Sequence, residues 1–399
     1  MTRQVQDAYI VSAVRSPVGK APRGMFRTVR PDDLLAHVLK AALAKTPGLD
    51  PKAIDDVIVG CAIPEAEQGM NVARIGLLLA GLPQSVSGLT VNRFCSSGLQ
   101  AVAIAADRIR LGEADVMIGA GTESMSLIPM GGHKIAINDA VFTRDENIGI
   151  AYGMGMTAEK VASKWQVNRE AQDAFAVESH RKALAAIAAG EFREEIAPYE
   201  IVSRTADLQS REFREDRRVA SDDEGPRPGT TQEALAKLSP VFAARGSVTA
   251  GNSSQTSDGA GAVILASEAA VKRFGLTPLA RFVGFAVAGV PPEIMGIGPI
   301  EAIPKVLRQT GLKASDMDWI ELNEAFAAQS LAVLRDLDLD ATKVNPLGGA
   351  IALGHPLGAT GAIRTATLVH GLRRRRQRYG MVTMCVGTGM GAAGVFEAL

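Results

Sequence analysis

The C-terminal third of this sequence repeats the N-terminal third, and an internal duplication limits the possible architecture more than any other feature of the chain. Three short segments recur in the same order, and each one combines apolar positions with a glycine or an asparagine at the matching place. The matched residues are 48–59 with 311–322, 91–92 with 344–345, and 116–122 with 382–388. Their separations differ by a few residues, as loops of unequal length produce. The pattern predicts two copies of one α/β unit.

Short apolar runs alternate with segments of helical periodicity. Residues 9–14, 57–60 and 116–119 have the continuous apolar character of buried strands. Residues 99–109 place apolar side chains at the spacing of a helix face, and Gly112 ends that helix. Strands that alternate with helices predict an α/β layered fold.

The middle of the chain does not have the alternating strand and helix patterns of the two repeated segments. Residues 157–187 have an amphipathic helical pattern, whereas residues 203–231 are polar and charged and predict an exposed loop. We interpret residues 122–250 as an insertion that stands over the mouth of the fold, where substrates usually bind. The predicted domains are an N-terminal half from residues 1–121 and 251–272, a loop domain from residues 122–250, and a C-terminal half from residues 273–399.

The overall composition excludes several classes of function. Lys plus Arg and Asp plus Glu each count 43, so no net charge attracts nucleic acid or an anionic membrane. The sequence has no apolar run of the ~18 residues that a membrane span needs, and we expect no signal peptide. Three widely separated cysteines favour reduced thiols in the cytoplasm. The five histidines show no paired ligand spacing, so we expect no metal site.

Cys95 lies in the segment VNRFCSSGLQ, directly before a predicted helix that begins near Ser97. Backbone N–H groups at a helix start carry partial positive charge, which stabilises a thiolate and lowers the pKa of a thiol. A lone cysteine is more often a small residue of the core. The flanking Ser-Ser-Gly permits a close backbone approach and favours a nucleophile at this position.

His355 lies in NPLGGAIALGHPLGATG, where Gly354 and Pro356 fix a turn around it. Imidazole is the side chain that can take a proton from a thiol near neutral pH. An isolated histidine in a loop is usually a surface residue. Five glycines crowd around this one, however, and they favour an imidazole at the bottom of a cleft.

Cys385 and Asn323 each follow a predicted strand. Cys385 precedes the glycine-rich GTGMGAAG, so its thiol could reach the same cleft and move a proton, although a core cysteine is the alternative. Asn323 stands in IELNEAFA, where a neutral amide could orient a water or donate to a developing oxyanion. The same asparagine could cap the helix that follows it.

Together these segments resemble the thiolase family, and the resemblance runs from Tyr9 to the C-terminus. VNRFCSSGLQAVA, NEAFA, GGAIALGHPLGATG and CVGTGMG occur in the family's order and at similar separations. SVTAGNSSQTSDGAG, residues 247–261, resembles the family's stretch beside the pantetheine arm of coenzyme A. The resemblance implies two similar βαβαβαββ halves in five layers (αβαβα), with an inserted loop domain that holds coenzyme A.

The resemblance also implies the activity, an acyltransferase that cleaves 3-oxoacyl-CoA with coenzyme A to acyl-CoA and acetyl-CoA. Cys95 would take the acyl group, and His355 would accept its proton and, with a water held by Asn323, polarise the thioester oxygen. Cys385 would protonate the leaving enolate, or deprotonate acetyl-CoA in synthesis. The backbone N–H groups of Cys95 and Gly387 would form a second oxyanion hole. Coenzyme A would be a co-substrate rather than a tightly bound cofactor, and its implied contacts are Arg227, Phe242, Ser254, Ala325, Phe326 and Met154.

One departure from the family bears on the substrate. Acetoacetyl-CoA-forming biosynthetic thiolases carry a His-Met-Gly triplet in the loop domain, and here Gly153 stands where that histidine would be. The loss of a bulky group near the acyl site favours a 3-ketoacyl-CoA thiolase of fatty-acid β-oxidation over condensation of two acetyl-CoA. A β-ketoacyl carrier-protein synthase normally lacks a second cysteine such as Cys385. A non-catalytic acyl-CoA carrier would tolerate loss of the thiols and the histidine, which are all present.

The sequence constrains the oligomeric state less than it constrains the fold. The resemblance implies a homodimer or a homotetramer, and the sequence favours neither. It also leaves open the acyl chain length, the direction of the reaction in the cell, and association with a β-oxidation multienzyme partner.

Overall fold

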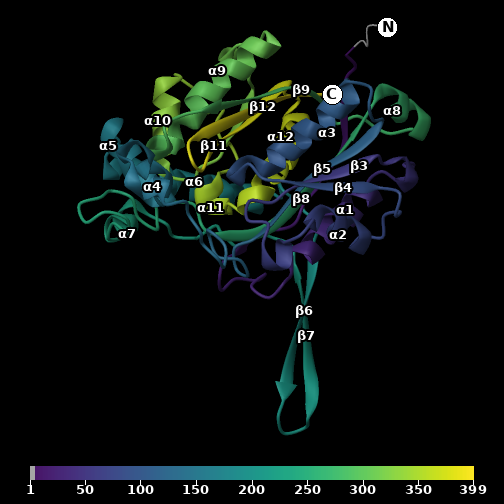
Figure 1. The fold of residues 1–399 in the computed structure, drawn as a ribbon, viewed down its shortest axis with the longest axis horizontal. Helices are drawn as coiled ribbons and strands as arrows, with labels where there is room; N and C mark the ends of the chain where they lie inside the picture. The colour runs from purple at the N-terminus through teal and green to yellow at the C-terminus, as the bar shows by residue number, and fades with distance from the viewer. Residues whose placement is uncertain (1–4) are drawn as a thin grey trace.

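The two predicted copies of the α/β unit form the two halves of a 10-stranded sheet in the computed structural model, which describes residues 5–399 (Figure 1). The strand order is β10-β11-β12-β9-β1-β8-β5-β3-β4, with β2 beside β8. The N-terminal strands are β1 (Tyr9–Arg15), β2 (Gly19–Lys20), β3 (Asp56–Gly60), β4 (Ser87–Val91), β5 (Val116–Ser124) and β8 (Ser257–Ala266). The C-terminal strands are β9 (Ala280–Gly289), β10 (Trp319–Leu322), β11 (Tyr379–Val386) and β12 (Met390–Ala398).

The repeat in the sequence corresponds to a repeat in strand pairing. In the N-terminal half β3 pairs in parallel with both β4 and β5, and in the C-terminal half β10 pairs in parallel with β11. Val344, the predicted counterpart of Val91 at the end of β4, forms an isolated parallel bridge with Ile320 of β10. The two half-sheets meet where Tyr9 and Ile10 of β1 pair with β9. The predicted duplication is confirmed.

Helices form three layers around the two half-sheets (Figure 1). On the outer face of the N-terminal half, α1 (Pro31–Ala44) packs on β8 and β5 beside α2 (Val72–Leu79). On the outer face of the C-terminal half, α9 (Gly298–Thr310) packs on β9 and β12. Between them, α3 (Ser97–Arg110) contacts β3, β5 and β9, and α12 (Thr360–Arg375) contacts β8 and β11. The expected five-layer αβαβα arrangement is therefore present. The other helices of the two halves are α8 (Glu268–Phe274), α10 (Ala327–Asp336) and α11 (Ala350–Leu353).

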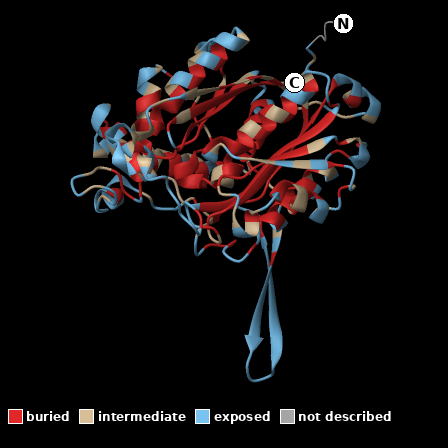
Figure 2. Cartoon of the chain, viewed as in Figure 1, coloured by how far each residue is buried: buried red, intermediate tan, exposed pale blue. Residues whose placement is uncertain are grey.

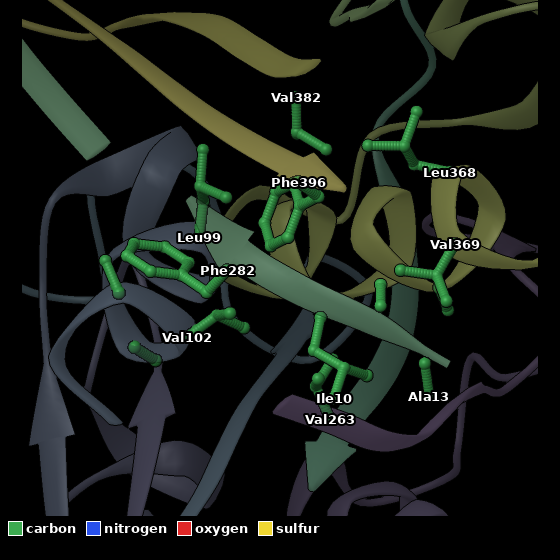
Figure 3. Close-up of a cluster of buried hydrophobic side chains, with 14 of the residues drawn as sticks. Ile10, Ala13, Leu99, Val102, Val263, Phe282, Leu368, Val369, Val382 and Phe396 are labelled. Carbon is green, nitrogen blue, oxygen red and sulfur yellow. The ribbon is translucent and has the colours of Figure 1, made fainter. Parts of the chain in front are cut away.

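Apolar side chains from both copies fill the space between the half-sheets (Figure 3). Leu99 and Val102 of α3 are fully buried there with Phe282 of β9 and Phe396 of β12. The two phenyl rings meet edge to face with their centroids 5.8 Å apart. Because burial of one large apolar side chain contributes about 1.5–3 kcal/mol, this shared cluster binds the two halves into one core.

The two central helices touch through their backbones near their N-terminal ends. A Cβ atom on Gly361 of α12 would lie 2.0 Å from the backbone nitrogen of Leu99 in α3. A Cβ atom on Gly98 of α3 would lie 2.7 Å from the carbonyl oxygen of Gly358. Neither position has room for a side chain, so the pair of glycines lets the starts of both helices meet at one place.

The segment between β5 and β8 carries most of the remaining helices. These are α4 (Ala140–Thr143), α5 (Met154–Lys164), α6 (Arg169–Ala188) and α7 (Gln232–Ala236). The helical prediction for residues 157–187 is confirmed by α5 and α6. Within residues 5–399, none of the helices has the length and apolar character needed to cross a membrane.

The prediction of an exposed loop over residues 203–231 is wrong for its first part. β6 (Tyr199–Asp207) and β7 (Glu212–Ala220) pair as an antiparallel ribbon that projects from the body, as Figure 1 shows. Its side chains beyond Ile201 are exposed until Ala220, and Figure 2 shows the ribbon in pale blue. Because both faces of the ribbon contact solvent, both carry polar residues, and the apolar-polar alternation that identifies a strand is absent.

We expect Gly361→Ala to destabilise the protein by at least about 1–3 kcal/mol, because the added methyl group overpacks the contact between α3 and α12. Urea unfolding followed by circular dichroism measures this difference. Gly289→Ala is the matched control, since a Cβ atom there would have its nearest neighbour at 4.0 Å. Equal unfolding midpoints for the two variants would show that the helix contact tolerates a side chain.

Candidate active site

Cys95 lies in the 3-10 turn η3 (Phe94–Ser96), and α3 begins at Ser97 as the sequence predicted. Two hydrogen bonds hold the turn. The Phe94 N–H donates to the Asn92 side chain at 2.8 Å, and the Arg93 N–H donates to the Ser97 hydroxyl at 2.8 Å. Phe94 has a φ of 43°, a left-handed conformation that side chains rarely adopt. The chain therefore turns sharply at the cysteine.

A cavity of about 510 Å³ opens beside Cys95. Apolar side chains make up most of its wall, including Ile63 and Pro64 after β3, Met154 at the start of α5, and Leu357 two residues after His355. Both halves of the duplicated fold and the inserted segment therefore contribute to one cavity. Cys95 is 8% exposed, so its sulfur meets the cavity from an otherwise buried position.

The electrostatic environment of Cys95 differs from our prediction of a lowered pKa. Burial is the largest influence and raises the pKa of the Cys95 thiol to about 11. The backbone N–H groups of Gly387 and of Cys95 itself act in the opposite direction but are the smaller influence. Exclusion of water disfavours the thiolate more than the field at the helix start stabilises it. Cys95 is thus a thiol near neutral pH, and these N–H groups are the two that we expected to form an oxyanion hole.

His355 lies between α11 and the 3-10 turn η7 (Leu357–Ala359), and its imidazole is buried. Its Nε2 atom is 3.3 Å from the Asn323 amide nitrogen, and its Nδ1 atom is 2.6 Å from the Thr360 hydroxyl. An amide nitrogen can only donate, so in this arrangement Nε2 accepts and Nδ1 carries the proton. Burial lowers the pKa of His355 to about 3, and the charge of Arg364 acts in the same direction. The imidazole is therefore neutral.

Asn323 follows β10 and faces His355 rather than capping a helix. The next helix, α10, has Phe326 at its N-cap, and Gln329 supplies the side-chain hydrogen bond to the Phe326 N–H. The Asn323 N–H donates to the Thr383 carbonyl at 2.9 Å and so fixes the asparagine to β11. Of the two roles that the sequence left open, the structure places Asn323 beside the imidazole.

Cys385 lies near the end of β11 and is fully buried, in an apolar cluster with Ala325 and Phe326. Burial raises the pKa of the Cys385 thiol well above its ordinary value, and a negative charge on Cys95 raises it further. The two sulfurs therefore influence each other, and each one disfavours ionisation of the other. Gly387, two residues after Cys385, lines the cavity beside Cys95.

Five of the six residues implied to contact coenzyme A gather on one side of this site. The rings of Phe242 and Phe326 meet edge to face at 6.2 Å between centroids. The Ser254 N–H donates to the Ala325 carbonyl at 2.9 Å, and Met154 packs against the cluster that contains Ala325 and Phe326. These contacts form a largely apolar group of side chains, of the kind that would suit a pantetheine chain.

Arg227 lies outside that group, in the exposed loop that follows β7. Its backbone N–H donates to the Nδ1 atom of His180 at 3.1 Å. Burial lowers the pKa of His180 to about 4, and the charges of Arg227 and Lys20 lower it further. The charges of Arg227 and Lys20 thus act on the same place, although the carboxylate of Glu224 also lies beside Lys20.

Glu123, which is buried near the end of β5, is not among the site residues that the sequence predicted. Its carboxylate accepts hydrogen bonds from the Ala62 N–H at 2.7 Å and from the Gly358 N–H at 2.8 Å, and also binds the Gln68 side chain. These bonds join the cavity wall of the N-terminal half to the turn that follows His355. Burial raises the pKa of Glu123. In the sequence, the one feature that could have indicated Glu123 is a charged residue at the end of a predicted apolar strand.

Thr360 and Ser257 were also missed, and both hold His355. The Thr360 hydroxyl contacts the imidazole, and the Ser257 hydroxyl accepts from the His355 backbone N–H at 3.0 Å. Ser257 is 98 residues away along the chain, and its segment, residues 247–261, was expected beside coenzyme A rather than beside His355. Among residues 5–399, no group of three His, Cys, Asp or Glu side chains is placed to hold a metal ion.

The fold and the site define the class of protein. Cys95, with two backbone N–H groups at its thiol, lines the cavity, and the buried Cys385 thiol is close enough for a charge on Cys95 to raise its pKa. The neutral imidazole of His355 lies two residues before Leu357, which lines the same cavity of this duplicated five-layer α/β fold. This is the arrangement of an acyltransferase that works through a cysteine. Residues 8–269 match the thiolase N-terminal domain, and residues 276–398 match the thiolase C-terminal domain. The chain belongs to the thiolase family.

Known proteins are similar to this chain over its whole length. A 3-ketoacyl-CoA thiolase of Bacillus subtilis (strain 168) is 53% identical over 393 residues, which cover 98% of this chain and 100% of that protein. A beta-ketoadipyl-CoA thiolase of Pseudomonas aeruginosa is 47% identical over 408 residues, covering 98% of this chain and 99% of that protein.

Solved structures also match. The acetyl-CoA acetyltransferase of Bacillus anthracis has a TM-score of 0.89 and 41% identity, with 100% of each chain covered. Human mitochondrial 3-ketoacyl-CoA thiolase has a TM-score of 0.88 and 42% identity, with 99% of each chain covered. Both structures therefore share the complete fold of this chain.

The raised pKa of Cys95 predicts how the free enzyme reacts with iodoacetamide, since only the thiolate is alkylated. With a pKa of about 11, the thiolate fraction increases with pH throughout the neutral range. We expect the alkylation rate to increase about tenfold per pH unit between about pH 7 and pH 9, without a plateau. Mass spectrometry of the peptide that contains Cys95 measures this rate, with Cys95→Ser as the control. A plateau below about pH 8 would contradict the raised pKa.

Proposed function

We propose that this thiolase cleaves 3-oxoacyl-CoA with coenzyme A to acyl-CoA and acetyl-CoA, as a 3-ketoacyl-CoA thiolase of fatty-acid β-oxidation. The observation that carries this proposal is the largely apolar cavity of about 510 Å³ beside Cys95. A condensation of two acetyl groups would leave most of such a cavity unused. An alkyl chain would bury apolar surface there, at about 0.8 kcal/mol for each CH₂ group.

Gly153 supports the same substrate class. A Cβ atom on Gly153 would have no neighbouring atom within 4 Å, so the space that a side chain would take at this position stays open. The next residue, Met154, lines the cavity. Gly153 itself does not line the cavity, so we expect its small size to affect the acyl site through the neighbouring Met154.

In the first half of the proposed reaction, the Cys95 sulfur attacks the C3 carbonyl carbon of the substrate. The proton of the thiol passes to the Nε2 atom of His355, which is unprotonated in the neutral imidazole, and the thiol replaces the Asn323 amide as the donor to this atom. Because both groups are uncharged before attack, proton transfer accompanies formation of the C–S bond. Donors near the two reacting carbonyls, Asn323 with His355 at one and the N–H groups of Cys95 and Gly387 at the other, would stabilise the developing oxyanions.

Cleavage of the C2–C3 bond then leaves the acyl group on Cys95 and expels the acetyl-CoA enolate. The Cys385 thiol donates a proton to the enolate carbon, and its high pKa keeps it protonated for this step. Coenzyme A enters along the Phe242 and Phe326 side, and its thiol attacks the acyl group and restores Cys95. The proton of coenzyme A passes to Cys385, and His355 returns its proton to the departing Cys95 sulfur, so protons balance over the cycle.

A second candidate function is the synthesis of acetoacetyl-CoA from two acetyl-CoA, the reverse reaction on the shortest chain. The match to the Bacillus anthracis acetyl-CoA acetyltransferase favours it, because that structure covers the entire chain. The same residues would act, with Cys385 removing a proton from acetyl-CoA. The open space beside Gly153 and the volume of the cavity favour the longer substrates instead.

We also propose a homodimeric or homotetrameric enzyme of the cytoplasm. β4 is the edge strand of the large sheet, and its Leu89 is exposed, so a second copy of the chain could cover this edge. Cys61, Cys95 and Cys385 are all free, which suits a reducing compartment. A β-oxidation multienzyme partner stays an additional prediction.

The two cysteines should fail in different ways when replaced by alanine. We expect Cys95→Ala to lose acyl transfer by at least about 10³-fold and to show no acetyl group after incubation with acetyl-CoA, because it lacks the nucleophile. We expect Cys385→Ala to acquire one acetyl group per chain but to lose carbon-carbon bond chemistry. Intact-mass analysis and a condensation assay measure these results. Acetylation that persists in Cys95→Ala would assign the nucleophile to another residue.

The chain-length profile of thiolysis tests the proposed function. We expect kcat/KM to increase from acetoacetyl-CoA to 3-oxooctanoyl-CoA by about tenfold or more, because each added CH₂ group enters the apolar cavity. Gly153→His, which fills the open space, should reduce the advantage of the longer substrate. A maximum at acetoacetyl-CoA in the unmodified enzyme would favour the biosynthetic alternative.

A further inference from the structure

The cavity beside Cys95 contains one side chain that carries a formal charge. Among the described residues that line it, Glu65 is the only Asp, Glu, Lys or Arg. Its neighbours in the wall include the apolar Ile63, Pro64, Met130 and Leu357. A carboxylate is unusual in an apolar wall, because its charge loses hydration there and must be compensated by a hydrogen-bond donor, a cation or water.

The position of the cavity relative to the thiol indicates which part of a substrate it receives. Phe242 and Phe326, which we expect along coenzyme A, do not line it, whereas Cys95 and Leu357 do. Met154 belongs to both regions, so it lies at the boundary between them. If coenzyme A enters on the Phe242 side, the cavity holds the end of the acyl chain that is remote from the thioester. This step depends on the proposed function.

The turn at residues 131–133, which contributes to the cavity wall, holds the side chain of Glu65 in place. Its Oε1 atom accepts a hydrogen bond from the His133 N–H at 2.9 Å. Its Oε2 atom lies so near Gly132 that a Cβ atom there would be 2.0 Å away. Gly131 of the same turn lines the cavity. The carboxylate is thus held against the wall and cannot swing freely into solvent.

No positive charge neutralises this carboxylate. In the part of the chain that the structure describes, none of the ion pairs includes Glu65. A methyl group at the end of an acyl chain would meet the apolar wall without penalty. A second carboxylate at that place would meet a like charge beside a largely apolar wall, where repulsion between charges is stronger than in bulk water.

We propose that Glu65 determines specificity at the remote end of the acyl chain, admitting 3-oxoacyl-CoA with an apolar end and rejecting 3-oxoacyl-CoA that ends in a carboxylate. 3-Oxohexanoyl-CoA and 3-oxoadipyl-CoA distinguish these classes, since both have six acyl carbons and differ only in a methyl or a carboxylate at the end. The thiolase scaffold itself does not forbid the second substrate, because a relative that is 47% identical is named a beta-ketoadipyl-CoA thiolase. The selection therefore resides in side chains of the cavity.

The test is the ratio of kcat/KM for 3-oxohexanoyl-CoA to that for 3-oxoadipyl-CoA, measured by thiolysis with coenzyme A. We expect the unmodified enzyme to prefer the first substrate, and Glu65→Gln to reduce this ratio by about tenfold or more, because the repulsion is removed. Glutamine can still accept the hydrogen bond from His133. Glu65→Lys should reduce the ratio further, since it places a positive charge near the incoming carboxylate.

Glu67→Gln is the matched control, because Glu67 lies in the same short turn and does not line the cavity. Its ratio should equal that of the unmodified enzyme. Unchanged ratios in both Glu65 variants would overturn the assignment of Glu65 while leaving the proposed thiolysis intact. An unmodified enzyme that cleaves neither six-carbon substrate but cleaves acetoacetyl-CoA would overturn the proposed function, and this inference with it.

Discussion

The contact between α3 and α12 is the constraint on which the rest of the structure depends. Each helix presents a glycine to the other, and a side chain at Gly361 would collide with the backbone of Leu99. The two helices therefore approach to the limit that backbone atoms allow. Since Cys95 lies in the turn before one helix and His355 lies just ahead of the turn before the other, this contact brings together two turns about 260 positions apart, and both turns contribute residues to the cavity wall. The half-sheets and the shared apolar cluster hold the helices in that position.

Burial then determines the chemistry of the site. It keeps both thiols protonated and the imidazole neutral, because each charged form would lose its hydration. Charge consequently appears only when a substrate carbonyl supplies an oxyanion near the N–H groups. The mutual influence of Cys95 and Cys385 adds an order to the events, since a thiolate on one opposes a thiolate on the other. The two thiols thus do not ionise together.

Much of the fold could be predicted because duplication leaves a record in the sequence. Glycines and asparagines at matching places identified both halves, and Val344 pairs with β10 as its counterpart does with β3. The β6–β7 ribbon could not be predicted, because strands that contact solvent on both faces lose the alternation on which such a prediction depends. The predicted direction of the Cys95 pKa shift was wrong for a related reason. A helix start is visible in the sequence, whereas the depth of burial is a property of the whole fold.

The candidate site shows the same division. Residues in glycine-rich motifs, such as Cys95 and His355, were found because their neighbours are unusual. Glu123, Ser257 and Glu65 act through contacts with residues 55 to 235 positions away, and their neighbours in the sequence do not indicate those partners. Their roles follow from which loops the fold brings together, and a single sequence without its fold contains no direct sign of that.

The paired architecture has a final consequence for the number of nucleophiles. The turn before α12 matches the turn before α3, and Gly358 occupies the middle of the one as Cys95 occupies the middle of the other. A Cβ atom on Gly358 would lie 2.7 Å from both Glu123 and the Cys61 backbone, so that spot is filled by the opposite half. The duplicated fold thus has two equivalent turns, η3 and η7, and at η7 the residues of the other half leave no room for a side chain. Of the two equivalent turns, only the one before α3 therefore has room for a cysteine side chain.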